Sequence, residues 1–365
     1  MNKLLSENIF NTKKVYGQDT LFLGERPGLF DTVNKRFSRI WSLYKTQKSL
    51  DWDENEFNYS SCNAQFKTSK TASKMIKTLA WQWEQDSVAA RTLLPIMAPF
   101  LSSSELQAAY GRVTDNEALH AATYSEIVRL SFDDPRVIID EVMRVEEAQS
   151  RMVVVSKIFD DAYVASHRYA LGDIPNDQKL YNIVFMFCVA GLVMERGQFG
   201  ASFAVTFAIA DTGEFQPIGK AVQKIAQDEL DIHAELAKEV LRIELTTERG
   251  QRAMRECLPL IKQLLLEVEN SEVSWVDYLH EDDEELPGVT PSMLKDWSRF
   301  CLRDVYEFFE FQVPEHFPKS NPLKYMAKWL NIAATQASPQ EQDNGQYKLG
   351  VLRRNDDNVI FDDNF

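Results

Sequence analysis

The sequence predicts an all-α protein, and three observations indicate this fold class. Glycine is sparse, at 14 of 365 residues, and the apolar–polar alternation that is typical of strands is hard to find. Long stretches instead repeat apolar residues every three or four positions, which is typical of amphipathic helices. With 44% hydrophobic and 26% charged residues, the chain has the composition of a soluble globular protein with a sizeable core.

Helical periodicity runs through most of the chain after residue 74. The expected helices cover residues 74–94, 104–130, 135–170, 180–210, 215–242, 246–281 and 291–312. The sequence SSSE fits a capping box at the start of the second helix, because Ser102 and Glu105 are three residues apart. Residues 1–70 carry turn signals such as GERPG, so we expect this part to be irregular.

The composition changes at Ser338, and this predicts two parts. Residues 1–337 contain no internal repeat and are expected to form one helical domain. Residues 338–365 are polar and lack an apolar period, so they are expected to form a flexible tail. The last eight residues, NVIFDDNF, place apolar side chains among acids, which favours a peptide that docks into a groove of a partner protein.

Charge, cysteines and apolar runs exclude several functions. The net charge of −15 argues against nucleic-acid binding. The four cysteines are scattered and form no CxxC pair, which favours a reducing compartment and no zinc ribbon. The N-terminus lacks the apolar run of a signal peptide, and the longest apolar run, Ile183 to Met194, has 12 residues, too few to span a bilayer. We therefore expect a cytoplasmic protein without a membrane segment.

One face of the expected helix 104–130 carries polar residues where apolar ones belong. The stripe with helical spacing consists of Leu106, Tyr110, Val113, Glu117, His120, Tyr124 and Ile127. A buried carboxylate or imidazole is costly unless it is paired or bound to a metal. With five histidines and 55 acidic residues in the chain, a chance acid–x–x–His match is common. On this stripe alone, a core histidine bonded to a neighbouring acid is an equal alternative.

Three further helices favour a metal site over that alternative. Asp86, Glu195 and Glu229 each lie in the middle of an otherwise mainly apolar stripe, and His233 follows Glu229. Acids from four helices, with a histidine beside two of them, are the pattern of di-iron carboxylate bundles. Carboxylates and imidazoles suit iron or manganese, and no thiolate lies among them. Four carboxylates can balance two divalent ions and leave coordination positions open for dioxygen.

These residues resemble a known family, the small, radical-generating subunit of class I ribonucleotide reductase. The resemblance covers nearly the whole chain. It lies in the segments LFLGERPGLFDTVNKRF, QDS at 85–87, EALHAATY at 117–124, MERGQFGASF at 194–203, IAQDE at 225–229 and NPLKYMAKWLN with the later PQE. It implies a ferritin-like helical bundle that forms a homodimer. The metal ligands that it implies are Asp86, Glu117, His120, Glu195, Glu229 and His233.

The resemblance also implies roles for residues around the metal ions. Tyr124 would carry a stable tyrosyl radical inside an apolar pocket made by Phe199, Phe203 and Ile225. Tyr124 lies one turn beyond His120 on the inward stripe, where its phenol is the oxidisable group, although an ordinary core tyrosine fits that position too. The residues implied in radical transfer to the large subunit are Trp52, Asp228, Tyr347 and Glu341.

One spacing departs from the family pattern. The second histidine usually follows its glutamate by three residues, as His120 follows Glu117, but ELDIH separates Glu229 and His233 by four. In a regular helix this rotates His233 by about 100° and still leaves both residues on one face. Alternatively, a π-bulge absorbs the additional residue. Asp231 is a less favoured substitute ligand.

The implied function is that of the small subunit of ribonucleoside-diphosphate reductase, active only with the large subunit. Two iron ions per subunit, or manganese, would react with dioxygen and oxidise Tyr124, and the large subunit would use that radical to reduce ribonucleotides to deoxyribonucleotides. The alternatives are a stand-alone ferritin-like di-metal oxidase and a ferroxidase that stores metal. Asp86 in place of a fourth glutamate, Tyr124, and the tail with Tyr347 favour the reductase.

Overall fold

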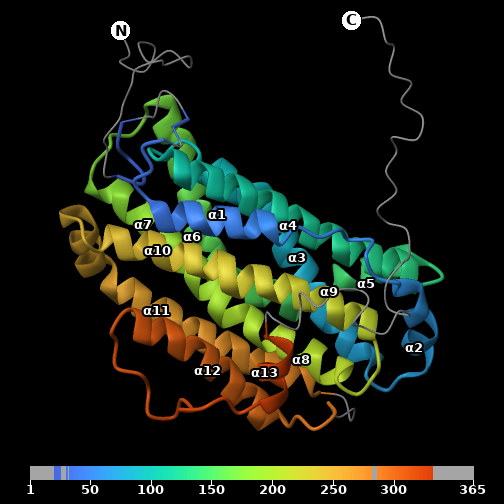
Figure 1. The fold of residues 1–365 in the computed structure, drawn as a ribbon. Coiled ribbons are helices and arrows are strands. Elements are labelled where there is room, and N and C mark those ends of the chain that lie inside the picture. The colour runs from blue at the N-terminus through green and yellow to red at the C-terminus, as the bar shows by residue number, and fades with distance from the viewer. Residues whose placement is uncertain (1–19, 26–29, 32, 282–285, 332–365) are drawn as a thin grey trace, which may run out of the picture.

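The protein is an elongated bundle of long helices (Figure 1). The structure, a computed structural model, describes residues 20–25, 30, 31, 33–281 and 286–331. The helices are α1 (Ser38–Ser49), α2 (Asn63–Thr68), α3 (Ala72–Met97), α4 (Ser104–Ser131), α5 (Pro135–Val142), α6 (Glu146–Leu171), α7 (Gln178–Val193), α8 (Phe199–Ala210), α9 (Gln216–Gln227), α10 (Ala234–Glu244), α11 (Glu248–Leu279), α12 (Pro291–Phe308) and α13 (Lys324–Trp329). Within the described ranges there is no strand, only two isolated bridges. The predicted all-α class is confirmed.

Two pairs of helices are continuous through a short π-helical turn. The turn η3 (Met194–Gln198) joins α7 to α8, and the turn η4 (Asp228–His233) joins α9 to α10. The α4 helix packs on α3 and α1, while η3 contacts η4 and α12. The bundle core therefore has α3, α4, α7–α8 and α9–α10 around its centre, and α6, α11 and α12 pack along α3 and α7–α8.

The cap of α4 differs from the prediction by one residue. Ser103, not Ser102, caps the helix, since its hydroxyl accepts a hydrogen bond from the Leu106 amide at 3.2 Å. The Ser102 hydroxyl accepts from the Gly24 amide instead, at 2.9 Å. The Glu105 carboxylate accepts from the Arg36 amide at 2.8 Å and so ties the segment before α1 to this helix end. A contact distant in sequence thus selects the capping serine.

Three predictions about the helices were wrong. The expected helix 135–170 is broken into α5 and α6, because Val145 adopts an extended ψ of 90° at the start of α6. Residues 1–70 were expected to be irregular, but they contain α1 and α2, and α13 was not predicted at all. The buried residues of α1 are only Ile40, Leu43 and Gln47, so its apolar period is too weak to be recognised in the sequence.

The segment Gln178–Ala210 is long and apolar enough to cross a membrane by length and composition. However, 78% of its most apolar window is buried inside the protein, as in the core helix of a globular bundle. The expected tail, residues 338–365, and the last residues of the expected domain lie outside the described residues, and so do Tyr347 and Glu341.

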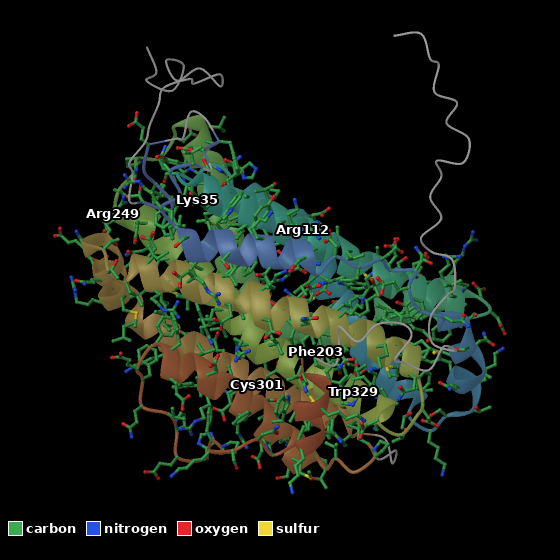
Figure 2. All side chains as sticks on the ribbon, viewed as in Figure 1. Lys35, Arg112, Phe203, Arg249, Cys301 and Trp329 are labelled. Carbon is green, nitrogen blue, oxygen red and sulfur yellow. The ribbon has the colours of Figure 1, made fainter. Side chains whose placement is uncertain are left out.

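The α8 and α9 helices approach each other closely near one end of the bundle. An ideal Cβ on Gly219 of α9 would lie 2.4 Å from the Ala210 Cβ and 3.3 Å from the Trp329 ring. Trp329 of α13 stacks on Phe207 of α8, with ring centroids 4.9 Å apart. Figure 2 labels Trp329 and Phe203, which both pack on Phe207 of α8. Only glycine allows this contact.

Gly219→Ala is therefore expected to destabilise the bundle by about 1–3 kcal/mol, because the added methyl group overpacks the contact. Gly191→Ala is the matched control, since no atom lies within 4 Å of its ideal Cβ. Alanine is the better helix former, so the control should have a thermal midpoint equal to or above that of the unmodified chain. Equal midpoints for the two variants would contradict the close approach.

Candidate metal centre

Six side chains from four segments meet at the centre of the bundle. Asp86 comes from α3, Glu117 and His120 from α4, Glu195 from η3, and Glu229 and His233 from η4. All six are buried, and none is more than 5% exposed. The structure thus brings together every residue that the sequence proposed as a metal ligand.

The six side chains form two overlapping groups. Asp86, Glu117, His120 and Glu229 form one group, and Glu117, Glu195, Glu229 and His233 form the other. In each group one ligand atom per residue lies within 4.8 Å of all the others. Glu117 and Glu229 belong to both groups, so the arrangement could hold two metal ions with two carboxylates between them.

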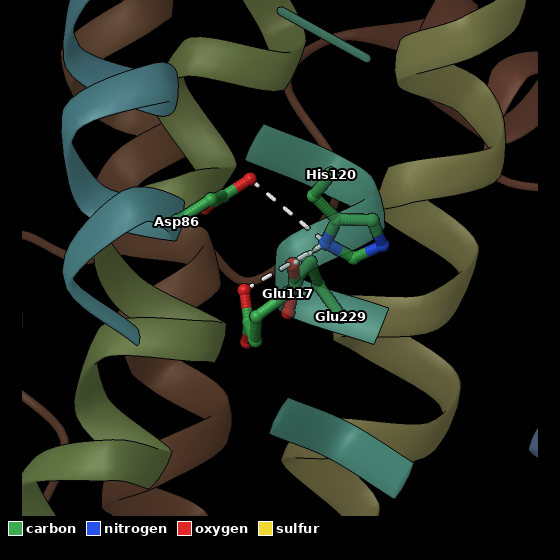
Figure 3. Close-up of side chains that lie close together, drawn as sticks. All are labelled: Asp86, Glu117, His120 and Glu229. Atoms are coloured by element: carbon green, nitrogen blue, oxygen red, sulfur yellow. Dashed lines mark ion pairs between the residues drawn. The ribbon is translucent and has the colours of Figure 1, made fainter. Parts of the chain in front are cut away.

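Both histidines direct Nδ1 at the carboxylates. His120 Nδ1 lies 2.8 Å from Glu229 Oε1, 3.7 Å from Glu117 Oε2 and 3.8 Å from Asp86 Oδ2. Figure 3 shows these three carboxylates directed at one ring nitrogen. His233 Nδ1 lies 2.7 Å from Glu229 Oε2 and 3.2 Å from Glu117 Oε1. The imidazoles therefore neutralise part of the acidic charge of the group.

Several carboxylate oxygens accept no hydrogen bond. Among the described residues, none is donated to either oxygen of Asp86, to Glu117 Oε2, to Glu195 Oε2 or to Glu229 Oε1, although three of these oxygens face His120 Nδ1. Burial raises the pKa of Asp86 and of Glu195, and the neighbouring carboxylates raise both further. An orphaned, buried carboxylate oxygen is costly, whereas a divalent cation would satisfy it. This donor set fits the two ions that the sequence predicted.

Glu229 and His233 shift the pKa of each other through their opposite charges. Burial alone would raise the pKa of Glu229, but His233 and His120 hold that pKa well below its usual range. Burial alone would lower the pKa of His233, but Glu229 and Glu117 raise it to about 10. The histidines and the carboxylates of the centre therefore each favour the charged form of the other. A metal ion must displace the Nδ1 proton of each histidine that it binds.

A π turn accommodates the four-residue spacing between Glu229 and His233. Glu229 and His233 both lie within η4, so the additional residue of ELDIH is accommodated by a π turn and not by a regular helix. Asp231 belongs to neither ligand group, and its carboxyl is only partly buried. A second π turn, η3, carries Glu195, and no feature of the sequence had pointed to it.

A second layer of polar side chains supports the histidines. Asp228 Oδ2 lies 3.2 Å from His120 Nε2 and accepts hydrogen bonds from Trp52 Nε1 at 2.9 Å and from Asn116 Nδ2 at 3.2 Å. Gln47 Nε2 lies 2.7 Å from His233 Nε2 and donates to Asn116 Oδ1 at 2.9 Å. Asn116 and Gln47 were not predicted from the sequence. Asn116 could have been noticed as a polar residue beside Glu117, but Gln47 lies on the unpredicted α1.

Tyr124 lies on the same helix as His120 and is 1% exposed. Its hydroxyl has no hydrogen-bond partner within the described part of the chain. Burial raises the pKa of Tyr124 well above its usual value, and the charges of Asp86, Glu229 and Glu117 raise it further. Tyr124 follows His120 by four residues on α4, so it lies one helical turn beyond that histidine. Phe199 and Phe203 are stacked with ring centroids 5.4 Å apart, and with Ile225 they are fully buried.

A helical bundle with two overlapping groups of carboxylate and histidine ligands is typical of the di-metal carboxylate class of proteins. The family model described as "Ribonucleotide reductase, small chain" matches residues 30–322. The chain belongs to this family, as the sequence analysis predicted.

Curated relatives match over nearly their whole length. The chain is 23% identical to the "Ribonucleoside-diphosphate reductase subunit beta" of Buchnera aphidicola subsp. Schizaphis graminum, covering 94% of this chain and 95% of the relative. It is 24% identical to the protein of that name from Haemophilus influenzae, covering 95% and 96%. It is 23% identical to the protein of that name from enterobacteria phage T4, covering 96% of this chain and 97% of the relative. The small-subunit function is confirmed, and the stand-alone oxidase and the ferroxidase are not favoured.

Solved structures share the fold. The "Ribonucleotide reductase R2 subunit from Clostridium botulinum" superposes with a TM-score of 0.77 at 17% identity, covering 89% of this chain and 98% of that one. The "dimanganese(II)-NrdF" of Streptococcus sanguinis has a TM-score of 0.63 at 11% identity, covering 82% and 98%. The predicted ferritin-like helical bundle is thereby confirmed.

Metal loading should stabilise the chain, and Asp86→Asn should reduce that effect. Asparagine removes a charge that burial and two neighbouring acids oppose, so the metal-free variant should melt at or above the unmodified chain. At free metal 100 times the dissociation constant, one site adds about 2.7 kcal/mol. Thermal melts with and without Mn²⁺ measure both effects.

Asp231→Asn is the control for this experiment, because Asp231 lies on η4 outside both ligand groups. It should keep the full metal-induced rise in thermal midpoint. If Asp86→Asn and Asp231→Asn responded to Mn²⁺ alike, Asp86 would not be a ligand.

Proposed function

We propose that the six clustered side chains are the metal ligands of this small subunit and that Tyr124 carries its radical. The supporting observation is the pair of ligand groups that share Glu117 and Glu229, with Tyr124 buried one helical turn beyond His120 on α4. The site is made of carboxylate and imidazole ligands only, which suits two iron ions per subunit, with manganese as the other candidate. When bound, the two ions supply, with dioxygen, the oxidising power that a phenol requires.

The surroundings of Tyr124 support its role. A tyrosyl radical survives only where water and reductants cannot reach it, and Tyr124 is 1% exposed. Phe199, Phe203 and Ile225 would line the apolar pocket, since all three are fully buried and none has an oxidisable group. A phenol releases its proton when it is oxidised to a neutral radical. The Tyr124 hydroxyl donates no hydrogen bond among the described residues, so this proton needs an acceptor. The carboxylates nearby could accept that proton.

A chain of contacts leads outward from the ligand groups and supports a role in radical transfer for Asp228 and Trp52. His120 Nδ1 faces the carboxylates, so its Nε2 is free to donate to Asp228 Oδ2, 3.2 Å away. The same oxygen accepts from Trp52 Nε1, and the Trp52 and His120 rings are stacked with centroids 6.1 Å apart. Trp52 is half-buried, so the path ends near the surface.

The small subunit of this enzyme acts with a large subunit, and we propose that the tail, residues 338–365, binds it. Val359, Ile360, Phe361 and Phe365 would fill an apolar groove, while the acids between them would meet basic residues at its rim. Tyr347, with Glu341 six residues before it, would relay the oxidation across the interface. We further propose that the chain forms a homodimer and acts in the cytoplasm.

Tyr124→Phe tests the radical assignment. The variant should bind metal and consume dioxygen as the unmodified chain does, because the ring volume is kept. It should show no tyrosyl signal by electron paramagnetic resonance and should support no ribonucleotide reduction with the large subunit.

Tyr110→Phe is the control for Tyr124→Phe. Tyr110 belongs to the same buried stripe but lies about 21 Å away along the α4 axis, so it should keep both the signal and the activity. A tyrosyl signal that persists in Tyr124→Phe would move the radical to another residue.

Deleting residues 358–365 tests the tail. The truncated chain should keep its metal and its tyrosyl signal but lose activity with the large subunit, and the free peptide 358–365 should compete with the intact chain. Competition should weaken as salt rises, because the acids contribute to binding. Full activity of the truncated chain would disprove the docking.

Tyr347→Phe should bind the large subunit normally and fail in turnover, since a phenylalanine ring cannot relay the oxidation.

A further inference from the structure

A charged residue outside the metal centre, Arg151 of α6, is buried deeply in the bundle, at 1% exposure. Its Nε and Nη2 donate to the two oxygens of Glu272 on α11, both at 2.6 Å. Its Nη1 donates to the Ser202 hydroxyl on α8 at 2.7 Å. Three of the five N–H donors of this guanidinium thus meet side-chain acceptors, and the buried charge is paired with a carboxylate.

The same guanidinium binds the π turn that carries Glu195. Arg151 Nη2 donates to the main-chain carbonyl of Gln198, the last residue of η3. In return, Gln198 Nε2 donates to the main-chain carbonyl of Arg151 at 2.9 Å. Two reciprocal hydrogen bonds therefore join α6 to η3, three residues after Glu195. A π turn is a rare distortion of a helix, and contacts from outside the helix can hold it in place.

Aromatic rings prevent the guanidinium from moving. The Arg151 Cζ lies 3.8 Å from the centroid of the Trp81 ring and 5.1 Å from that of Trp275. Trp81 in turn contacts Phe199, the first residue of α8, edge to face at 4.9 Å. Side chains of α3, α11 and α8 thus hold Arg151 in place. Because Arg151 binds the Gln198 carbonyl, the end of η3 is held in place with it.

We propose that Arg151 is the positioning residue of η3 and keeps Glu195 aimed at the second ligand group. This inference rests on the proposed role of Glu195 as a ligand. Glu195 belongs to only one of the two groups, the one that contains His233, whereas Asp86 and His120 belong to the other. Loss of Arg151 should therefore weaken one metal site and spare its neighbour. A purely structural ion pair would weaken both sites together or neither.

Arg151→Lys tests the proposal, because lysine keeps the charge opposite Glu272 but cannot form the fork. The metal-free variant is compared with the unmodified chain by amide hydrogen exchange and by titration with Mn²⁺, followed by electron paramagnetic resonance. We expect faster exchange at Met194–Gln198 with unchanged exchange in α4 and α9. We expect one Mn²⁺ to bind at least about tenfold more weakly, leaving an uncoupled spectrum from the other ion.

Three further variants make the result decisive. Ser202→Ala removes only the bond to Arg151 Nη1 and should keep two coupled ions and normal exchange. Gln198→Leu removes the reciprocal bond alone and should weaken the same Mn²⁺ site to a smaller extent, so it decides the question if Arg151→Lys does not fold. Glu195→Ala should lose that Mn²⁺ site while the exchange of η3 stays slow.

The outcomes separate the two proposals. If Glu195→Ala kept both ions, the ligand assignment would fail. If Glu195→Ala lost one ion but Arg151→Lys and Gln198→Leu kept two coupled ions with unchanged exchange in η3, only the role of Arg151 would fail. Equal weakening of both Mn²⁺ sites in Arg151→Lys would also overturn that role, since it would show a general loss of structure.

Discussion

Buried carboxylates repel one another and lose their hydration, and this bundle holds four of them at its centre together with two histidines. Asp86 and Glu195 Oε2 accept no hydrogen bond among the described residues, and burial raises the pKa of both groups, so the protein alone compensates their charges poorly. A cation pair is the simplest compensation. The rest of the architecture follows from this constraint, because four helical segments must present acids to one point while their other faces form an apolar core.

The helices meet this demand by departing from regular geometry at two points. Glu195 lies in η3 and Glu229 and His233 lie in η4, so three of the six side chains depend on π turns. Contacts from other helices reach η3 and α10, the helix that follows η4. Arg151 holds the end of η3, while Asp304 of α12 accepts from Arg196 Nε at 2.7 Å and pairs with Lys238 of α10 at the same distance. Local distortion at the centre is thus stabilised by ion pairs in the surrounding helices.

The polar layer behind the histidines links the two ligand groups. Asn116 donates to Asp228, which faces His120, and accepts from Gln47, which faces His233. Both imidazoles are therefore oriented by one hydrogen-bonded network that also includes Trp52. A change at either histidine alters the donors and acceptors available to the other, so the positions of His120 and His233 and the contact to Trp52 are linked through this network.

The sequence by itself determined the all-α class, the inward stripe of α4 and the six clustered side chains, because burial imposes a period of three to four residues that can be read without coordinates. Only the tertiary structure decided that Glu117 and Glu229 are shared between the two groups, that Ser103 caps α4, and that α5 and α6 separate at Val145. It also decided the π turn beneath His233 and the contacts of Gln47 and Arg151. The shared carboxylates and the contacts of Gln47 and Arg151 depend on partners distant in the chain, and the helical period records only which face is buried and not which residues it contacts.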